Sequence, residues 1–203
     1  RWFEKEFADY ERSVQEGLGS SSLDQLNEIA REIPPGSEGL IFLPYMAGER
    51  SPIWNDRAKG VYYGVDFSKT KGHFVRASME GVAYALRHNL DVAKAAGAKV
   101  EELRAVGGSA NSLLWTQIKA DVTGKRIVVP SSDTAAALGA VILAGVGIGM
   151  YQSFEEAVGM TVKVDRVHEP DMEKHAQYQK YYDMYLQLYE DLKDLMEKTG
   201  GSQ

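Results

Sequence analysis

The sequence of 203 residues contains no cysteine. This absence excludes disulfide bonds, zinc sites built from thiolates and thiol nucleophiles, and it is compatible with the cytoplasmic location that we expect. No apolar run reaches the roughly 20 residues that a helix needs to cross a bilayer, so we expect no membrane contact. The first four residues also lack the basic start and the apolar middle of a secretory signal.

Positive charge is scarce as well. Lys and Arg number 23 against 29 Asp and Glu, which gives a formal net charge of −6 at pH 7. Without a basic stripe to neutralise phosphates, we expect no nucleic-acid binding. The histidines at positions 88, 168 and 175 show no spacing with carboxylates that is typical of a metal site, so we expect no metal ligands in this chain.

The composition that remains is that of a globular domain. Hydrophobic residues make up 44% and charged residues 26% of the chain, which is enough apolar material for a well-buried core. No linker divides the sequence, and we expect one domain over residues 1–203, with a helical lead-in over residues 1–37 and a C-terminal helix over residues 171–198. The chain begins with Arg inside a helical pattern, so we expect it to be a piece of a longer protein.

The first residues of the chain have the spacing of apolar side chains that is typical of a helix. Apolar side chains recur at three- and four-residue steps before the glycines and serines of residues 17–22, which predicts one helix that contains Phe3, Phe7, Tyr10 and Val14. A second helix is predicted over residues 23–33, with Ser22 as its N-cap, and two prolines and a glycine then turn the chain.

Strand and helix patterns alternate through the rest of the chain. Strand patterns occupy residues 39–44, 60–67, 102–106 and 126–130, and helical patterns occupy residues 72–96, 111–123, 135–145 and 153–158. Residues 161–165 fit either a last strand or an extended connector. This order predicts an α/β fold with a mixed or parallel sheet flanked by helices.

Residues 107–112, which read Gly-Gly-Ser-Ala-Asn-Ser, lie between a predicted strand and a predicted helix. Gly107 and Gly108 would let a ligand approach the backbone without a Cβ in the way, and the free N–H groups at the helix start favour polar or anionic groups. The spacing is neither that of a dinucleotide-binding loop nor that of a P-loop. Taken alone, the motif fits a tight turn packed under a helix better than a binding site.

Several other residues have two interpretations. His73 stands where it could cap the long helix, and Glu80 could organise a domain interface. Asp121 and Asp133 could contact magnesium through water, although a structural role fits Asp121 better. The helical stripe near the C-terminus indicates either packing on the parent domain or an interaction surface, and it consists of Tyr178, Tyr182, Tyr185 and Tyr189.

Four blocks between residues 38 and 149 together resemble the FGGY family of carbohydrate kinases, in their order and in their spacing. They are the Gly-Glu-Arg-Ser-Pro loop at residues 48–52, the glycine-rich arm and helix start at residues 60–80, the Gly-Gly block at residues 107–121 and the Ala-Leu-Gly-Ala block at residues 137–144. The first loop and Trp115 resemble the xylulose-kinase branch most.

This resemblance implies a ribonuclease H-like domain of the actin, Hsp70 and hexokinase type, which closes with a second domain on ATP, Mg²⁺ and a sugar. It implies that Gly107 and Gly108 lie against the ribose and the α-phosphate, that Ser112 contacts adenine, and that Ser109 is a neighbour. The family's phosphate loop and its general-base aspartate are not in this sequence, so the resemblance implies no catalytic residue here.

Two functions follow as hypotheses. In the first, the chain is the C-terminal half of an ATP-dependent sugar kinase that acts on a ketopentose such as xylulose, and its partners are the sugar and an N-terminal kinase domain. In the second, the chain is an autonomous nucleotide-binding or dimerisation module, which forms a homodimer through the helix at residues 171–198.

Overall fold

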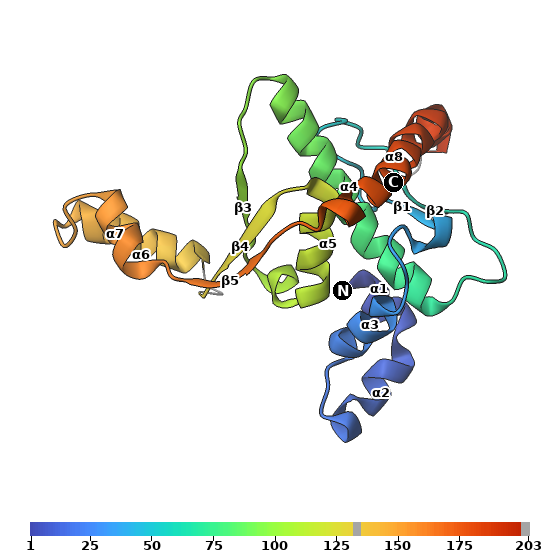
Figure 1. Ribbon diagram of the computed structural model, residues 1–203, viewed down its shortest axis with the longest axis horizontal. Helices are drawn as coiled ribbons and strands as arrows, with labels where there is room; N and C mark the ends of the chain where they lie inside the picture. The colour runs from blue at the N-terminus through green and yellow to red at the C-terminus, as the bar shows by residue number, and fades with distance from the viewer. Residues whose placement is uncertain (132–134, 200–203) are drawn as a thin grey trace.

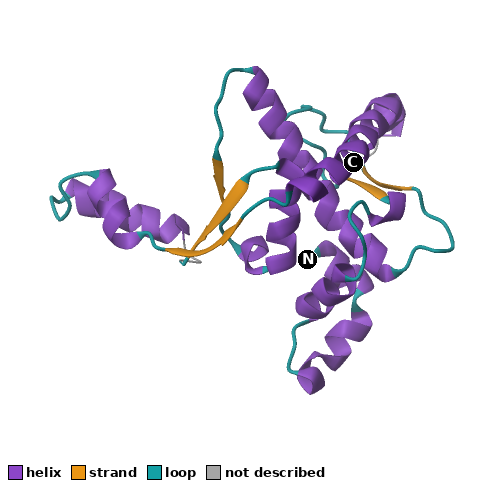
Figure 2. Ribbon diagram, viewed as in Figure 1, coloured by secondary structure: helices purple, strands orange, loops and turns teal. Residues whose placement is uncertain are grey.

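The computed structural model describes residues 1–131 and 135–199. Asp133 and the last four residues lie outside this part, so the interpretation of Asp133 as a magnesium contact has no structural counterpart here. Among the described residues, the strands form two small sheets that lie beside the helices (Figure 2).

The two sheets differ in how their strands run relative to one another. In one, β1 (Ile41–Pro44) pairs antiparallel with β2 (Gly60–Tyr63). In the other, β4 (Arg126–Pro130) lies between β3 (Glu102–Arg104), to which it is parallel, and β5 (Val164–His168), to which it is antiparallel. The predicted mixed sheet is therefore confirmed. The extended segment near residue 161 starts later than predicted, because Thr161 still belongs to a helix.

Three helices cross at the centre of the molecule (Figure 1). They are α4 (Lys71–Ala95), α5 (Leu113–Thr123) and α8 (Met172–Thr199). The stripe tyrosines of α8 are at most 8% exposed and belong to the main hydrophobic core with Leu43 and Ile118. This confirms the packing interpretation and leaves these tyrosines inside the chain.

Hydrogen bonds between Thr70 and His73 explain why α4 begins at Lys71. The backbone N–H of Thr70 donates a 3.1 Å hydrogen bond to Nδ1 of His73, and the Thr70 side chain accepts from the backbone of His73. This reciprocal capping satisfies donors that the first helical turn leaves without partners. The predicted capping role of His73 is confirmed.

The lead-in contains one more break than predicted. The chain forms α1 (Trp2–Phe7) and α2 (Asp9–Leu18) instead of one helix, because Ala8 leaves the helical region with φ −117° and ψ 38°. The guanidinium of Arg12 bonds to the carbonyls of Glu4 and Lys5, and the Glu4 carbonyl also accepts the backbone N–H of Ala8 at 3.2 Å. The next helix, α3 (Ser22–Arg31), is capped by Ser21, one residue before the predicted cap.

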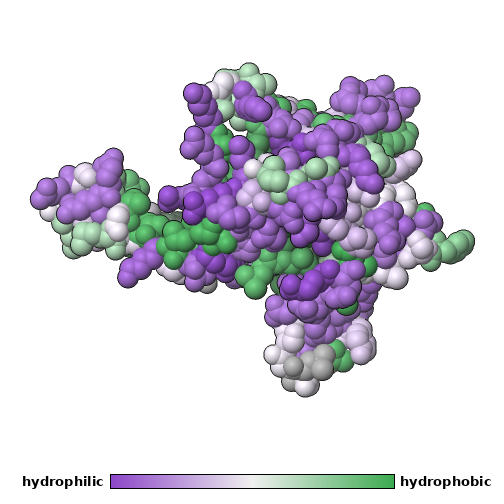
Figure 3. Space-filling view, viewed as in Figure 1, coloured by the Kyte–Doolittle hydropathy of each residue, from purple (hydrophilic) through white to green (hydrophobic). Residues whose placement is uncertain are grey.

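A helical arm leaves the body of the molecule at the ends of β4 and β5 (Figure 1). It consists of α6 (Ala135–Gly147) and α7 (Phe154–Thr161). Apolar surface is visible where the arm meets the sheet (Figure 3). Two short 3₁₀ helices complete the fold, η1 (Ser37–Gly39) and η2 (Gly108–Asn111).

Candidate functional site

The Gly-Gly segment forms the turn from β3 into η2, which leads into α5. The backbone N–H of Ala105 continues the pairing of β3 by donating to the carbonyl of Val128 at 3.0 Å, and the chain turns immediately afterwards. Gly107 has φ 81° and ψ −178°, a conformation that is essentially limited to glycine. The backbone therefore needs a glycine at position 107 in order to turn away from β3 at this point.

Both glycines face open space. A Cβ added at Gly107 or at Gly108 would have no other heavy atom within 4 Å. Gly108 also has no positive φ, so neither packing nor backbone conformation demands glycine there. A tight turn packed under a helix would show close neighbours at these positions. The open backbone instead fits a segment that a ligand can approach.

Ser112 caps the N-terminus of α5. Its Oγ accepts the backbone N–H of Trp115 at 3.1 Å and donates to Oδ1 of Asn27 on α3 at 3.0 Å. The first contact is an N-cap, and the second joins two segments that are 85 residues apart in the sequence. A ligand at this position would therefore meet Asn27 together with Ser112.

Ser109 has a charged neighbour. Its Oγ accepts a hydrogen bond from Nζ of Lys119 at 3.1 Å, and the same ammonium lies 4.5 Å from the centroid of the Trp115 ring. Lys119 is only 9% exposed. Burial lowers the pKa of Lys119 from its ordinary value of 10.5, since the charged form loses hydration.

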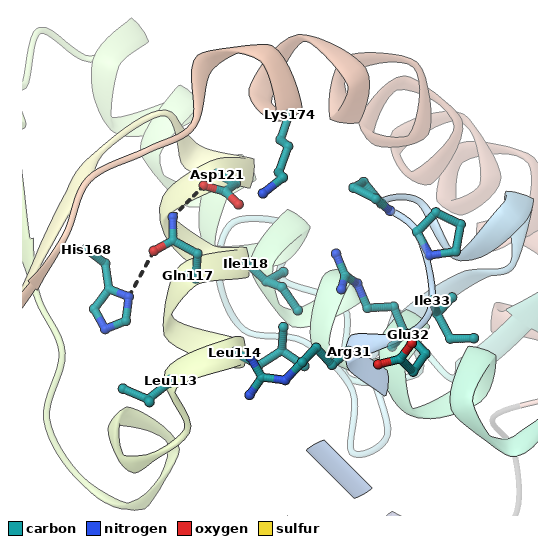
Figure 4. A pocket seen from close by; sticks show the side chains of 13 residues that line it. Arg31, Glu32, Ile33, Leu113, Leu114, Gln117, Ile118, Asp121, His168 and Lys174 are labelled. Carbon is teal, nitrogen blue, oxygen red and sulfur yellow. Dashed lines mark hydrogen bonds between the residues drawn. The ribbon is translucent and has the colours of Figure 1, made fainter. Parts of the chain in front are cut away.

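A cavity of about 610 Å³ lies against α5 and is drawn in Figure 4. Its wall includes Gln117, whose side chain bridges His168 Nδ1 at 3.0 Å and Asp121 Oδ1 at 2.7 Å. Leu114 and Ile118 supply apolar lining from the same helix. The four residues predicted to bind adenosine are not among those that line this cavity.

Asp121 has a structural role in this arrangement. Its Oδ1 accepts the backbone N–H of Asp171 at 2.9 Å as well as the Gln117 amide, and its side chain is buried. Burial raises the pKa of Asp121, although these two hydrogen bonds partly offset the effect. Within residues 1–131 and 135–199, no group of three or more His, Cys, Asp or Glu side chains is arranged to hold a metal ion.

The structure thus places Gly107 at the turn after β3, Gly108 and Ser109 in η2, and Ser112 at the N-cap of α5. Sequence reasoning missed two side chains that join them, Asn27 and Lys119. The Asn27 contact has no local sequence signal, because it depends on how α3 packs beside α5. The sequence around Lys119 mixes polar and apolar residues, so it gave no clear signal that this lysine is buried. In the part of the chain that the structure describes, no helix is both long and apolar enough to cross a membrane.

Comparison with known proteins identifies relatives along most of the chain. Residues 2–148 match the model of the C-terminal domain of the FGGY family of carbohydrate kinases. The chain is 34% identical to a xylulose kinase of Staphylococcus epidermidis over 87% of its residues, and 36% identical to a gluconokinase of Bacillus licheniformis over 93%. It spans only 36% and 37% of the lengths of these two relatives.

Solved structures agree with this assignment. The ligand-bound xylulose kinase from Lactobacillus acidophilus superimposes with a TM-score of 0.80 at 29% identity, over 91% of this chain and 38% of that one. The expected ribonuclease H-like α/β fold of the actin and hexokinase type is confirmed by this match. The chain therefore belongs to the FGGY family of carbohydrate kinases, of which it carries the C-terminal part.

Proposed function

We propose that the full-length protein transfers a phosphoryl group from ATP to a hydroxyl of a sugar, and that residues 1–203 form its C-terminal, nucleotide-binding domain. The observation that carries the proposal is the open backbone at Gly107 and Gly108. In this proposal the ribose and the α-phosphate lie against these glycines, Ser112 faces adenine, and Ser109 lies beside them. The protein would act in the cytoplasm.

The chemistry of the turn fits a nucleoside phosphate. It offers bare backbone, the hydroxyls of Ser109 and Ser112 and the ammonium of Lys119, all from the segment at the start of α5 or from α5 itself. Phosphoryl transfer depends on positioning and on neutralising phosphate charge, and Mg²⁺ carried by the nucleotide would supply part of that neutralisation. The residues of this chain would bind and orient the adenosine end of ATP, while the catalytic base would come from the N-terminal domain.

For the acceptor we propose a ketopentose such as xylulose. This choice is supported by the loop at residues 48–52 and by the similarity to xylulose kinases at 34% identity. A gluconokinase is similar at 36%, so an acid sugar is the competing acceptor. The test is to measure ADP release by the full-length protein with xylulose, ribulose, gluconate and glycerol. We expect the fastest release with xylulose, and no release with any sugar or polyol would refute the kinase proposal.

The binding site has its own test. Gly108→Val places a branched side chain where the structure has open space, so it would leave the fold intact and block the approach of a nucleotide. We expect the affinity for ATP, measured by calorimetric titration, to fall at least tenfold, the equivalent of about 1.4 kcal/mol. The control is Gly159→Ala on α7, which also meets no atom within 4 Å and is expected to leave ATP binding unchanged. Equal binding by the two variants would remove the Gly-Gly turn from the site.

A further inference from the structure

Lys119 is a buried cation that has no acidic partner among the residues that the structure describes. Its residue is 9% exposed, and its Nζ has as neighbours the Ser109 hydroxyl at 3.1 Å and the face of Trp115 at 4.5 Å. Neither neighbour carries a negative charge. Within the described residues no carboxylate forms an ion pair with it, and burial alone accounts for its lowered pKa.

Two other cations with buried side chains have carboxylate partners. Arg76 is 6% exposed and bonds to the carboxylate of Glu80 at 2.7 Å. The Lys69 side chain, also 6% exposed, lies 3.5 Å from the carboxylate of Asp66. A buried ammonium without a counter-ion costs free energy, because its hydration is lost and no charge replaces it. Its presence beside a turn that is open to ligand indicates that the missing negative charge arrives from outside.

The position of the ammonium defines what would supply that charge. Ser109 follows directly on the two open glycines, so a ligand that lies along that backbone comes next to the hydroxyl that holds Lys119. An ammonium has three N–H donors, and the Ser109 hydroxyl occupies one of them. Phosphate oxygens accept such hydrogen bonds strongly, since both partners are charged.

We propose that Lys119 is a binding residue that holds a phosphate of the nucleotide against residues 107–109. This inference rests on the proposed function, because it requires a nucleotide at the Gly-Gly turn. The neutral part of the ligand, adenosine, has no charge for Lys119 to meet. Lys119 therefore distinguishes nucleotides that carry phosphate from the bare nucleoside.

The test compares ATP with adenosine in the full-length protein, by calorimetric titration of wild type and three variants. Lys119→Met removes the charge and keeps an unbranched side chain, whereas Lys119→Arg keeps the charge. Lys94→Met is the matched control, because it removes a charge from an exposed position on α4. A hydrogen bond to a charged group corresponds to a factor of about 10 to 100 in affinity.

We expect Lys119→Met to weaken ATP binding by that factor while adenosine binds as in wild type. Lys119→Arg retains more of the ATP affinity than Lys119→Met, and Lys94→Met changes neither ligand. The melting temperature of Lys119→Met without ligand is expected to equal or exceed that of wild type, since a buried unpaired charge is lost. A binding role and a purely structural role thus predict different signs for the change in stability.

The outcomes separate this inference from the proposed function. If wild type binds neither ATP nor adenosine, the proposed function fails, and the inference fails with it. If wild type binds both and Lys119→Met weakens both equally, or weakens neither, the inference alone is overturned. A fall in melting temperature without a selective loss of ATP also overturns it, because Lys119 then serves the fold, for example by pairing with an acidic side chain outside residues 1–203.

Discussion

Nε of Arg76 donates a 2.7 Å hydrogen bond to Oε1 of Glu80 one turn further along α4, and both side chains are buried. Glu80 also accepts from the backbone N–H of Gly36, the hydroxyl of Ser37 and the hydroxyl of Tyr178, at 2.9 to 3.0 Å. Burial alone would lower the pKa of Arg76, but the Glu80 carboxylate raises it above its ordinary value. This carboxylate therefore joins α4, α8 and the turn before β1 inside the chain.

Removing this charge should destabilise the fold. Glu80→Gln leaves the Arg76 guanidinium buried without a counter-ion, so we expect the free energy of unfolding to fall by about 3–5 kcal/mol. Urea unfolding measures the change. Glu28→Gln is the control, because Glu28 pairs with Arg31 at an exposed site where a loss of about 1 kcal/mol or less is expected. Equal losses in the two variants would show that the Glu80 cluster is not a buried ion pair in solution.

The close approach of α4 to β1 gives a second prediction. A Cβ on Gly81 would lie 2.3 Å from the carbonyl oxygen of Phe42, which is backbone and cannot move aside cheaply. We expect Gly81→Ala to lower the free energy of unfolding by about 1–3 kcal/mol, the usual cost of overpacking. Gly159→Ala on α7 meets no atom within 4 Å, so it should raise stability by about 0.5–1 kcal/mol through helix propensity. A change of the same sign in the free energy of unfolding of both variants would contradict this account.

Much of the fold follows from local patterns, as α4 shows. Each of its bounds differs by only one residue from the predicted range. Its helical apolar pattern extends over many residues, and its N-cap is formed by residues close in sequence, Thr70 and His73. The break at Ala8 could not be predicted in this way. It is accompanied by hydrogen bonds from the Arg12 side chain to carbonyls seven and eight residues earlier, which helical periodicity does not report.

The candidate site also combines residues that local sequence patterns predict with contacts that they do not predict. Gly107 and Gly108 stand out in the sequence because paired glycines between a strand and a helix would let a ligand approach the backbone. The contacts that complete the site depend on tertiary packing. Asn27 reaches Ser112 across 85 residues, and Lys119 is buried with its ammonium against the Ser109 hydroxyl. Periodicity carries no information on either contact.

The stability of the chain should depend on pH through His168. Burial, together with the charge of Arg166, lowers the pKa of His168 below its ordinary value of 6.5, although Asp121 acts in the opposite direction. Between the lowered pKa and 6.5 the unfolded chain binds more protons than the folded one, so the free energy of unfolding falls as the pH decreases through this window. Urea midpoints between about pH 7.5 and about pH 5.5 would measure the slope.

The variant His168→Asn tests the assignment of this slope. An asparagine side chain cannot titrate, so the pH dependence should become shallower than in wild type. It should not vanish, because burial also lowers the pKa of His88. A slope that is unchanged in His168→Asn would show that other groups control the pH dependence of stability.

Two buried tyrosines join the first sheet to the C-terminal helix and provide the last prediction. The hydroxyls of Tyr45 and Tyr185 lie 2.5 Å apart, and both residues are at most 1% exposed. Tyr185→Phe leaves the Tyr45 hydroxyl buried without this partner, which costs about 1–3 kcal/mol of unfolding free energy. Replacing both tyrosines by phenylalanine removes both polar groups, so the double variant should lose less than the sum of the two single variants. Urea unfolding of the four proteins gives the coupling, for which we expect about 0.5–3 kcal/mol. Strictly additive losses would mean that the two hydroxyls do not bond to each other.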